Sequence, residues 1–259
     1  MSDTAILTLR TMLANLDDAK KYQSLRDVMS TLPAPDLAAV FEDLPPEKMP
    51  VLFRLCPKDL AAEIFAELTP ETQQDLIDGL TDKELKAVVD DLFVDDATDL
   101  VEEMPANVVK KVLQNADEGT RKTINQFLNY PENSAGSVMT AEYVGLKKNM
   151  TVEQAFDYIR KYGVDKETIY TCYVMDEKRR LEGVVTVKDL LMNDYAALMG
   201  DIMDPHVIKA YTTEDQEKVV ETFNEYNLLS LPVVDGEDRL VGIITVDDVM
   251  DVMEQEATE

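Results

Sequence analysis

A short apolar repeat runs through the first half of the chain and limits what this half can fold into. Large apolar residues recur every 11 to 13 positions, and most of them precede a proline or a threonine. Proline in a first helical turn, with Asp, Glu or Thr beside it, marks a helix start. Each repeat therefore has room for one helix of roughly two turns and a connecting turn. The repeated positions are Leu32, Leu44, Leu55, Leu68, Leu80, Leu92 and Met104.

The apolar residues between these marks follow helical spacing, as in Leu85, Val88, Val89 and Leu92. A helix this short cannot bury an apolar face alone, so its neighbours in sequence must stack on it. We therefore expect residues 1–130 to form an all-helical, solenoid-like superhelical domain.

A second repeat follows a break at residues 131–137, whose Pro, Asn, Ser and Gly predict a linker. Residues 181–189, LEGVVTVKD, match residues 240–248, LVGIITVDD. Each repeat is expected to contain a strand, a helix, a strand, a tight turn, a strand and a helix. We expect one α/β module made of two units, residues 138–200 and 201–253, and the start of an acidic helix at residues 247–259.

Acidic residues outnumber basic ones, 52 against 25, which gives a net charge of −27. This charge argues against nucleic acid and anionic lipid as partners. The acids are concentrated: residues 60–103 hold 14 acids and two bases, and residues 247–259 hold six acids and no base. A uniformly acidic, soluble protein is the alternative that composition alone supports.

Several classes of function lack the residues they need. With only Cys56, Cys172 and His206, the chain cannot assemble a zinc or iron–sulfur site, and a reducing compartment is expected. No run of 18 apolar residues or signal peptide is present, so we expect a cytosolic chain or a cytosolic piece of a larger protein. A phosphate-binding glycine loop and a nucleophile with a paired base are missing as well. Paired acids could serve a metal-dependent hydrolase, but a solenoid offers no evident substrate pocket, and we predict that the chain is not an enzyme.

The second repeat resembles the CBS domain, a regulatory module named after cystathionine β-synthase. The phrase Leu231-Pro232-Val233-Val234-Asp235, followed by residues 240–245, is close to the most typical segment of that family. The order of parts resembles the cytosolic region of MgtE-type magnesium transporters: an acidic helical domain, the segment 135–140, a CBS pair and an acidic helix. The resemblance covers essentially all 259 residues.

This resemblance implies a homodimer formed through the CBS domains, and a connecting helix that leads into the transporter's own transmembrane domain, which this chain lacks. It places the full-length protein at the cell membrane with this soluble fragment on the cytoplasmic face. It also implies that Mg2+ bound between the domains closes the channel when cytosolic Mg2+ is high. The apolar helix residues Val219, Val220 and Phe223 are expected to need the cover of a partner.

Mg2+ prefers oxygen ligands and is usually held by one or two carboxylates. Asp91, Asp95, Asp99 and Glu103 follow a spacing of four, which predicts that they share one helix face. Asp247 and Asp251 are likewise one turn apart. Facing acidic surfaces repel each other until a divalent ion lies between them, which describes a switch. The alternative for each acid is an ordinary solvated helix face.

Carried over residue by residue, the resemblance assigns Mg2+ ligands to both parts of the chain. A neutral residue, Asn227, stands where the resemblance leads us to expect a further acid; its amide oxygen can coordinate, but without charge. The ligands implied are Glu63, Asp95 and Asp99 in the helical domain, and Asp248, Asp251, Glu256 and Glu259 in the second CBS unit and the helix that follows it.

CBS pairs also bind adenine nucleotides, and their typical phrase is a Thr followed three residues later by an Asp that holds the ribose. Thr186 with Asp189 and Thr245 with Asp248 both fit this phrase, so ATP or another adenine nucleotide is a second candidate ligand. The same spacing suits a helix start, where Thr caps and Asp favours the first turn. A freestanding adenine-nucleotide sensor, unconnected to transport, is the alternative function.

Overall fold

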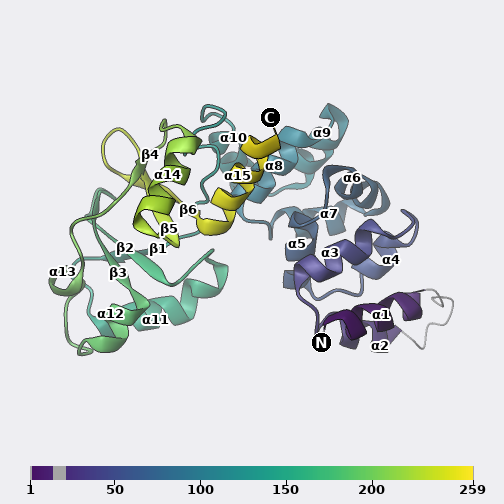
Figure 1. Cartoon of the computed structure of the whole chain (residues 1–259), viewed down its shortest axis with the longest axis horizontal. Helices are drawn as coiled ribbons and strands as arrows, with labels where there is room; N and C mark the ends of the chain where they lie inside the picture. Colours follow the sequence, from purple (N-terminus) through teal and green to yellow (C-terminus); the bar gives the residue numbers. More distant parts are fainter. Residues whose placement is uncertain (1, 14–21, 259) are drawn as a thin grey trace. The chain divides into compact units, whose positions relative to one another are not determined.

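The computed structural model describes residues 2–13 and 22–258, and the chain divides into two units (Figure 1). Unit 1 contains residues 1–92 and 96–124, and unit 2 contains residues 93–95 and 125–259. Among the described residues, no helix is long and apolar enough to cross a membrane.

Unit 1 is helical throughout its described residues. The helices that begin in it or cross its boundary are α1 (Ser2–Leu13), α2 (Tyr22–Met29), α3 (Ala34–Glu42), α4 (Met49–Phe53), α5 (Lys58–Ala66), α6 (Pro70–Gly79), α7 (Asp82–Val89), α8 (Val94–Glu103), α9 (Ala106–Asn115) and α10 (Glu118–Phe127).

The repeated turn residues start these helices, as the sequence predicts. Pro33, Pro57 and Pro105 occupy the N-cap positions of α3, α5 and α9. Thr81 caps α7 in a capping box, in which its side chain accepts a hydrogen bond from the backbone N–H of Glu84. Because each helix has its own start signal, the chain turns after every one to three helical turns.

The helices stack in the order that a solenoid requires. Helix α3 packs on α5, α5 on α7 and α7 on α9, and α4 packs on α6. Each helix therefore contacts the next helix but one, because successive turns reverse the direction of the chain. Of the repeated apolar residues, Leu32, Leu68, Leu80 and Met104 are buried. The predicted superhelical domain is confirmed.

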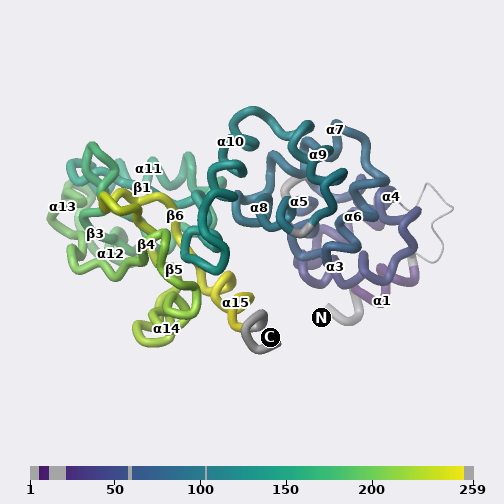
Figure 2. The backbone as a smooth tube through the Cα atoms, turned by 90° about the horizontal axis from the view of Figure 1, so that it is seen from above, coloured from purple at the N-terminus to yellow at the C-terminus, as the bar shows by residue number. Residues whose placement is uncertain are grey.

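Unit 2 contains two three-stranded sheets of the same topology. Figure 2 traces the backbone through the strands of both sheets. In each sheet the first strand is parallel to the second, and the second is antiparallel to the third. The predicted order of strands and helices is therefore confirmed. The elements are β1 (Val144–Lys147), α11 (Val152–Tyr162), the 3-10 helix η2 (Gly163–Asp165), β2 (Thr171–Met175), β3 (Leu181–Thr186), α12 (Val187–Met192), α13 (Met199–Ile202), β4 (Ala210–Tyr211), α14 (Gln216–Tyr226), β5 (Ser230–Val234), β6 (Leu240–Thr245) and α15 (Val246–Thr258).

The two repeats of unit 2 exchange the segments that precede their first strands. Thr140, ahead of β1, pairs with Ile243 of the second sheet, and Asp204, ahead of β4, pairs with Val184 of the first sheet. A Cβ atom at Gly183 would lie 2.9 Å from the carbonyl oxygen of Asp204, and one at Gly242 would lie 2.6 Å from that of Thr140. Glycine recurs at this position in both repeats because the exchanged backbone approaches so closely.

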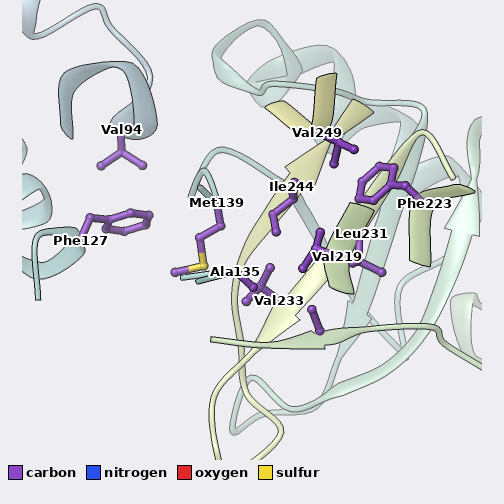
Figure 3. Packing of buried hydrophobic residues seen from close by; sticks show 11 residues of the cluster. Val94, Phe127, Ala135, Met139, Val219, Phe223, Leu231, Val233, Ile244 and Val249 are labelled. Carbon is purple, nitrogen blue, oxygen red and sulfur yellow. The ribbon is translucent and has the colours of Figure 1, made fainter. Parts of the chain in front are cut away.

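The core of the second repeat joins helix and sheet residues from several parts of unit 2 (Figure 3). Val219 and Phe223 of α14 lie in it beside Ile244 and Val249, and they are only 2% and 4% exposed. Val220 packs against the same cluster. The expectation that these three residues need a partner's cover is therefore wrong, because α15 and the sheet already cover them. Ala135, from the predicted linker 131–137, is buried in this core as well.

Asn227 ends α14 in the left-handed helical conformation, with φ 52° and ψ 49°. Asparagine tolerates this conformation better than other residues with a Cβ atom, apart from aspartate. Its amide is therefore explained by backbone geometry, without any ligand.

Replacing Asn227 tests this reading. Asn227→Ala should lower the free energy of unfolding by about 1 kcal/mol because alanine is strained at positive φ, whereas Asn227→Gly should be close to wild type. Denaturant unfolding checks both, with Asn224→Ala in the middle of α14 as the control. Equal stability of the Ala and Gly variants would contradict the backbone explanation.

Candidate functional site

Helix α8 turns its acidic residues outward. Val94, Ala97, Leu100 and Val101 are buried on its apolar side, whereas Asp99 is exposed. Asp95, one turn earlier, is partly buried. Because four residues nearly complete a turn, Asp95 and Asp99 are neighbours on one face. They occupy the side of α8 opposite its apolar residues.

Two of the four acids predicted to share one helix face differ from Asp95 and Asp99. Asp91 lies in the turn between α7 and α8. The prediction that it shares a helix face with Asp95 is therefore wrong, because α7 already ends at Val89. The side chain of Glu103 lies outside the described residues. Glu63 is exposed on α5, two positions before the buried Phe65.

The second group of predicted ligands begins α15. Asp247 and Asp251 are exposed and one turn apart, whereas Val249 and Val252 are buried. This helix therefore presents carboxylates from its first turn, where its dipole favours negative charge. The side chain of Glu256 and the whole of Glu259 lie outside the described residues.

Asp248 differs from its two acidic neighbours because it is largely buried. Its Oδ2 accepts hydrogen bonds from the backbone N–H of Thr245 at 2.7 Å and from Thr245 Oγ1 at 2.8 Å. Burial, assisted by the charges of Asp247 and Asp251, raises the pKa of the Asp248 carboxyl to about 6. The hydrogen bonds from Thr245 oppose this rise but do not cancel it.

The first Thr/Asp phrase is a capping box. Asp189 Oδ2 accepts from the backbone N–H of Thr186 at 2.9 Å and from Thr186 Oγ1 at 2.5 Å, and the Asp189 N–H donates back to Thr186 Oγ1 at 3.2 Å. Thr186 and Asp189 therefore start α12 as Thr245 and Asp248 start α15. Helix capping accounts for this spacing in both repeats.

Equivalent positions next to these two Thr/Asp pairs carry different side chains. The N–H of Val187 bonds to the carbonyl of Tyr170 at 3.0 Å, and that of Val246 bonds to the carbonyl of Leu229 at 3.1 Å, so Tyr170 corresponds to Leu229. Lys188 corresponds in the same way to Asp247. The first repeat thus offers an exposed aromatic ring and a cation, and the second offers a leucine and an acid.

Tyr170 was missed by sequence reasoning. The sequence carried a signal for it, because the matching segments 181–189 and 240–248 lie 59 positions apart, as do Tyr170 and Leu229. The matching backbone hydrogen bonds establish this correspondence.

Within the part of the chain that the structure describes, no three or more His, Cys, Asp or Glu side chains converge to form a metal cage. Mg2+ needs no such cage, because it keeps several waters and is held by one or two carboxylates. Pairs such as Asp95 with Asp99, or Asp247 with Asp251, are the arrangement of oxygen ligands that suits it.

Comparison with known families finds the same two parts in the same order. The model of the MgtE intracellular N domain matches residues 32–133. The CBS domain model matches residues 135–194 and 199–255. The magnesium transporter MgtE of Thermus thermophilus is 39% identical over 241 residues, which are 92% of this chain and 53% of that protein. The chain therefore spans about half the length of the curated relatives it matches.

Two solved structures resemble almost the entire chain. The cytosolic domain of the Mg2+ channel MgtE in complex with ATP is 36% identical with a TM-score of 0.87, over 95% of this chain and 99% of that one. The soluble part of a magnesium transporter is 27% identical with a TM-score of 0.92, over 99% of this chain and 100% of that one. These relatives are parts of transporters and not enzymes.

The raised pKa of Asp248 predicts how stability depends on pH. In metal-free buffer, the unfolded chain ionises this carboxyl near its ordinary value of 3.8 and the folded chain ionises it only at about 6. The folded state therefore loses stability as pH rises through this window. Asp248→Asn removes the loss, so its advantage over wild type should grow between pH 4 and pH 7, by up to about 3 kcal/mol.

Denaturant unfolding at several pH values measures this difference. Asn retains an oxygen that can accept from Thr245, so the cap is not removed together with the charge. Glu225→Gln, which removes an exposed acid on α14, serves as the matched control. A constant difference between Asp248→Asn and wild type across this range would contradict the pKa assignment.

Proposed function

Because the chain belongs to the MgtE family of magnesium transporters, we propose that it is the Mg2+-sensing regulatory region that gates such a transporter from the cytosolic side. The relative with a known structure is named as the cytosolic domain of a Mg2+ channel. The match to the MgtE N domain favours this function over a freestanding nucleotide sensor, because a CBS pair alone does not need that helical domain.

The observation that carries the proposal is the outward position of carboxylates on α8 and at the start of α15. Like charges one turn apart destabilise a helix by a few tenths of a kcal/mol each. A net charge of −27 adds repulsion over longer distances. A divalent cation that binds between these carboxylates removes the repulsion that they experience in the metal-free protein.

The mechanism we propose places Mg2+ between the helical domain and the CBS pair. Glu63, Asp91, Asp95 and Asp99 provide oxygens from the helical domain, and Asp247, Asp248, Asp251, Glu256 and Glu259 provide them from the CBS side. The bound ion turns repulsion between two acidic surfaces into attraction. Free Mg2+ therefore shifts the equilibrium toward a closed arrangement, and the loss of Mg2+ releases it.

Neutralising the α8 pair tests this mechanism. Asp95→Asn with Asp99→Asn should weaken Mg2+ binding by about tenfold or more, because each removed charge acts on a divalent ion a few Å away. The same change should make the metal-free chain more compact, since less repulsion remains. Calorimetry and X-ray scattering with and without millimolar Mg2+ measure the two effects.

A double-mutant cycle then asks whether both parts of the chain contact one ion. Asp95→Asn and Asp251→Asn should be non-additive in the Mg2+ midpoint if they do. Glu47→Gln and Glu225→Gln, which remove exposed acids elsewhere, are the matched controls. If the controls shift the midpoint as far as the α8 and α15 variants do, the response is general screening.

Adenine nucleotide is the second ligand that we propose, at the first repeat only. Tyr170 can stack on a base, Lys188 can meet a phosphate and Asp189 can accept from ribose hydroxyls. The equivalent positions Leu229, Asp247 and Asp248 offer no ring and repel phosphate. The relative of known structure was solved in complex with ATP, and we propose that the first repeat has diverged toward nucleotide and the second toward cation.

Calorimetry with ATP distinguishes the two copies. Asp189→Ala and Tyr170→Ala should each weaken binding by about tenfold, whereas Asp248→Ala should leave it near wild type. Lys188→Glu should weaken ATP more than adenosine, since only ATP carries phosphates. Equal losses from Asp189→Ala and Asp248→Ala would contradict the assignment to one cleft.

A homodimer through the CBS domains remains part of the proposal, but other residues support it. Leu191, Met192 and Tyr195, in and after α12, are 68%, 77% and 67% exposed. Apolar side chains this exposed, grouped within five positions, are typical of an interface between copies.

A further inference from the structure

Helices α9 and α10 form the walls of a groove whose chemistry is unlike the rest of this acidic chain. The groove has a volume of about 600 Å3 and lies wholly within unit 1. Met104, Val109 and Leu113 give it an apolar floor. It is shallow and open along α9, so it suits a helix better than a small molecule, which needs most of its surface buried.

Two cations border this floor. Lys110 is exposed and has no ion-pair partner among the described residues. The guanidinium of Arg121 is held at the groove by a hydrogen bond from Nη1 to the carbonyl oxygen of Leu113, at 3.3 Å. Lys111 and Lys122 lie on the same two helices. Residues 105–123 hold four bases and two acids, which reverses the balance of the whole chain. The groove therefore favours an acidic occupant with an apolar stripe.

The chain itself carries a helix of this kind. On α15, Val249 and Val252 are buried within unit 2, whereas Val246, Met250 and Met253 are 40%, 62% and 47% exposed. These three follow i, i+4, i+7 spacing and form a second apolar stripe, one that unit 2 leaves uncovered.

The stripe and the groove match in length and in charge. Val246 to Met253 is a run of eight residues, as is Ala106 to Leu113 along α9, and their seven helical steps cover about 10 Å in each case. Asp247 and Asp251 lie along one side of the stripe, as Lys110 and Gln114 lie along one side of the α9 floor.

We propose that the α9–α10 groove binds the α15 stripe of a second copy of this chain. Asp247 and Asp251 of that copy then face Lys110 and Arg121, while its methionines cover Val109 and Leu113. A two-fold dimer makes this contact twice and leaves neither groove open. The inference rests on the proposed dimer and adds a contact outside the CBS modules.

Cross-linking between two differently tagged copies tests the contact. One copy carries Gln114→Cys and the other Met250→Cys, so a bridge between the two new thiols must join different molecules. Co-expressed pairs, purified through both tags and treated with a short bismaleimide in EDTA, should yield the cross-linked dimer. EDTA is used because Mg2+ competes for the same carboxylates. The wild-type chain measures the background from Cys56 and Cys172.

Charge reversal supplies the specificity control. Lys110→Glu should lower the yield about fivefold, because an attractive pair becomes a repulsive one, and Asp251→Lys in the other copy should restore it. Lys83→Glu, at an exposed lysine outside the groove, should leave the yield unchanged.

The contradicting outcomes are distinct. A light-scattering mass of one chain, 29.2 kDa, would contradict the proposed dimer and this contact with it. If the chain is a dimer but gives no cross-link, the groove contact alone is wrong. The same conclusion follows if Lys110→Glu does not change the cross-linking yield. A chain bearing both cysteines that cross-links only within itself overturns the assignment to a second copy.

Discussion

Electrostatic repulsion among carboxylates is the constraint on which the arrangement of this chain depends. Acids outnumber bases 52 to 25, and both α8 and the start of α15 bury their apolar residues while Asp99, Asp247 and Asp251 stay exposed. Where one acid is buried, at Asp248, its pKa rises to about 6. Repulsion between carboxylates lowers the stability of the fold, and a divalent cation that binds the exposed carboxylates relieves it. The sensing function that we propose therefore uses the same interaction that limits stability.

Duplication explains how one module can offer two chemistries. The two sheets share topology, capping residues and a glycine at the point where the exchanged segments meet. Their backbone positions are equivalent, and only the side chains differ: Tyr170 and Lys188 in the first repeat, Leu229 and Asp247 in the second. A shared backbone therefore places different side chains at equivalent positions, which is why we propose different ligands for the two repeats.

Charge also distinguishes surfaces that would otherwise look alike. Exposed apolar residues occur on α12 and on α15, and partly buried ones line the groove along α9, which Lys110 and Arg121 border. Hydrophobic contact has no direction and fits any of these surfaces to any other. Opposite charges beside the apolar stripes are what select one pairing, in this case the acidic α15 with the basic groove.

The sequence by itself determined the features that local chemistry controls. Prolines and capping threonines begin the helices where the repeat predicts, and the two matching nine-residue segments predicted the two α/β repeats. The spacing of the acids predicted that Asp95 and Asp99 share one helix face. It also placed Asp91 on that helix, because spacing alone does not show where a helix ends. Only the tertiary structure decided that Val219 and Phe223 are covered within their own unit, and that the repeats exchange the segments ahead of their first strands. These features depend on contacts between residues far apart in the chain, and local patterns in sequence carry no record of which distant surfaces meet.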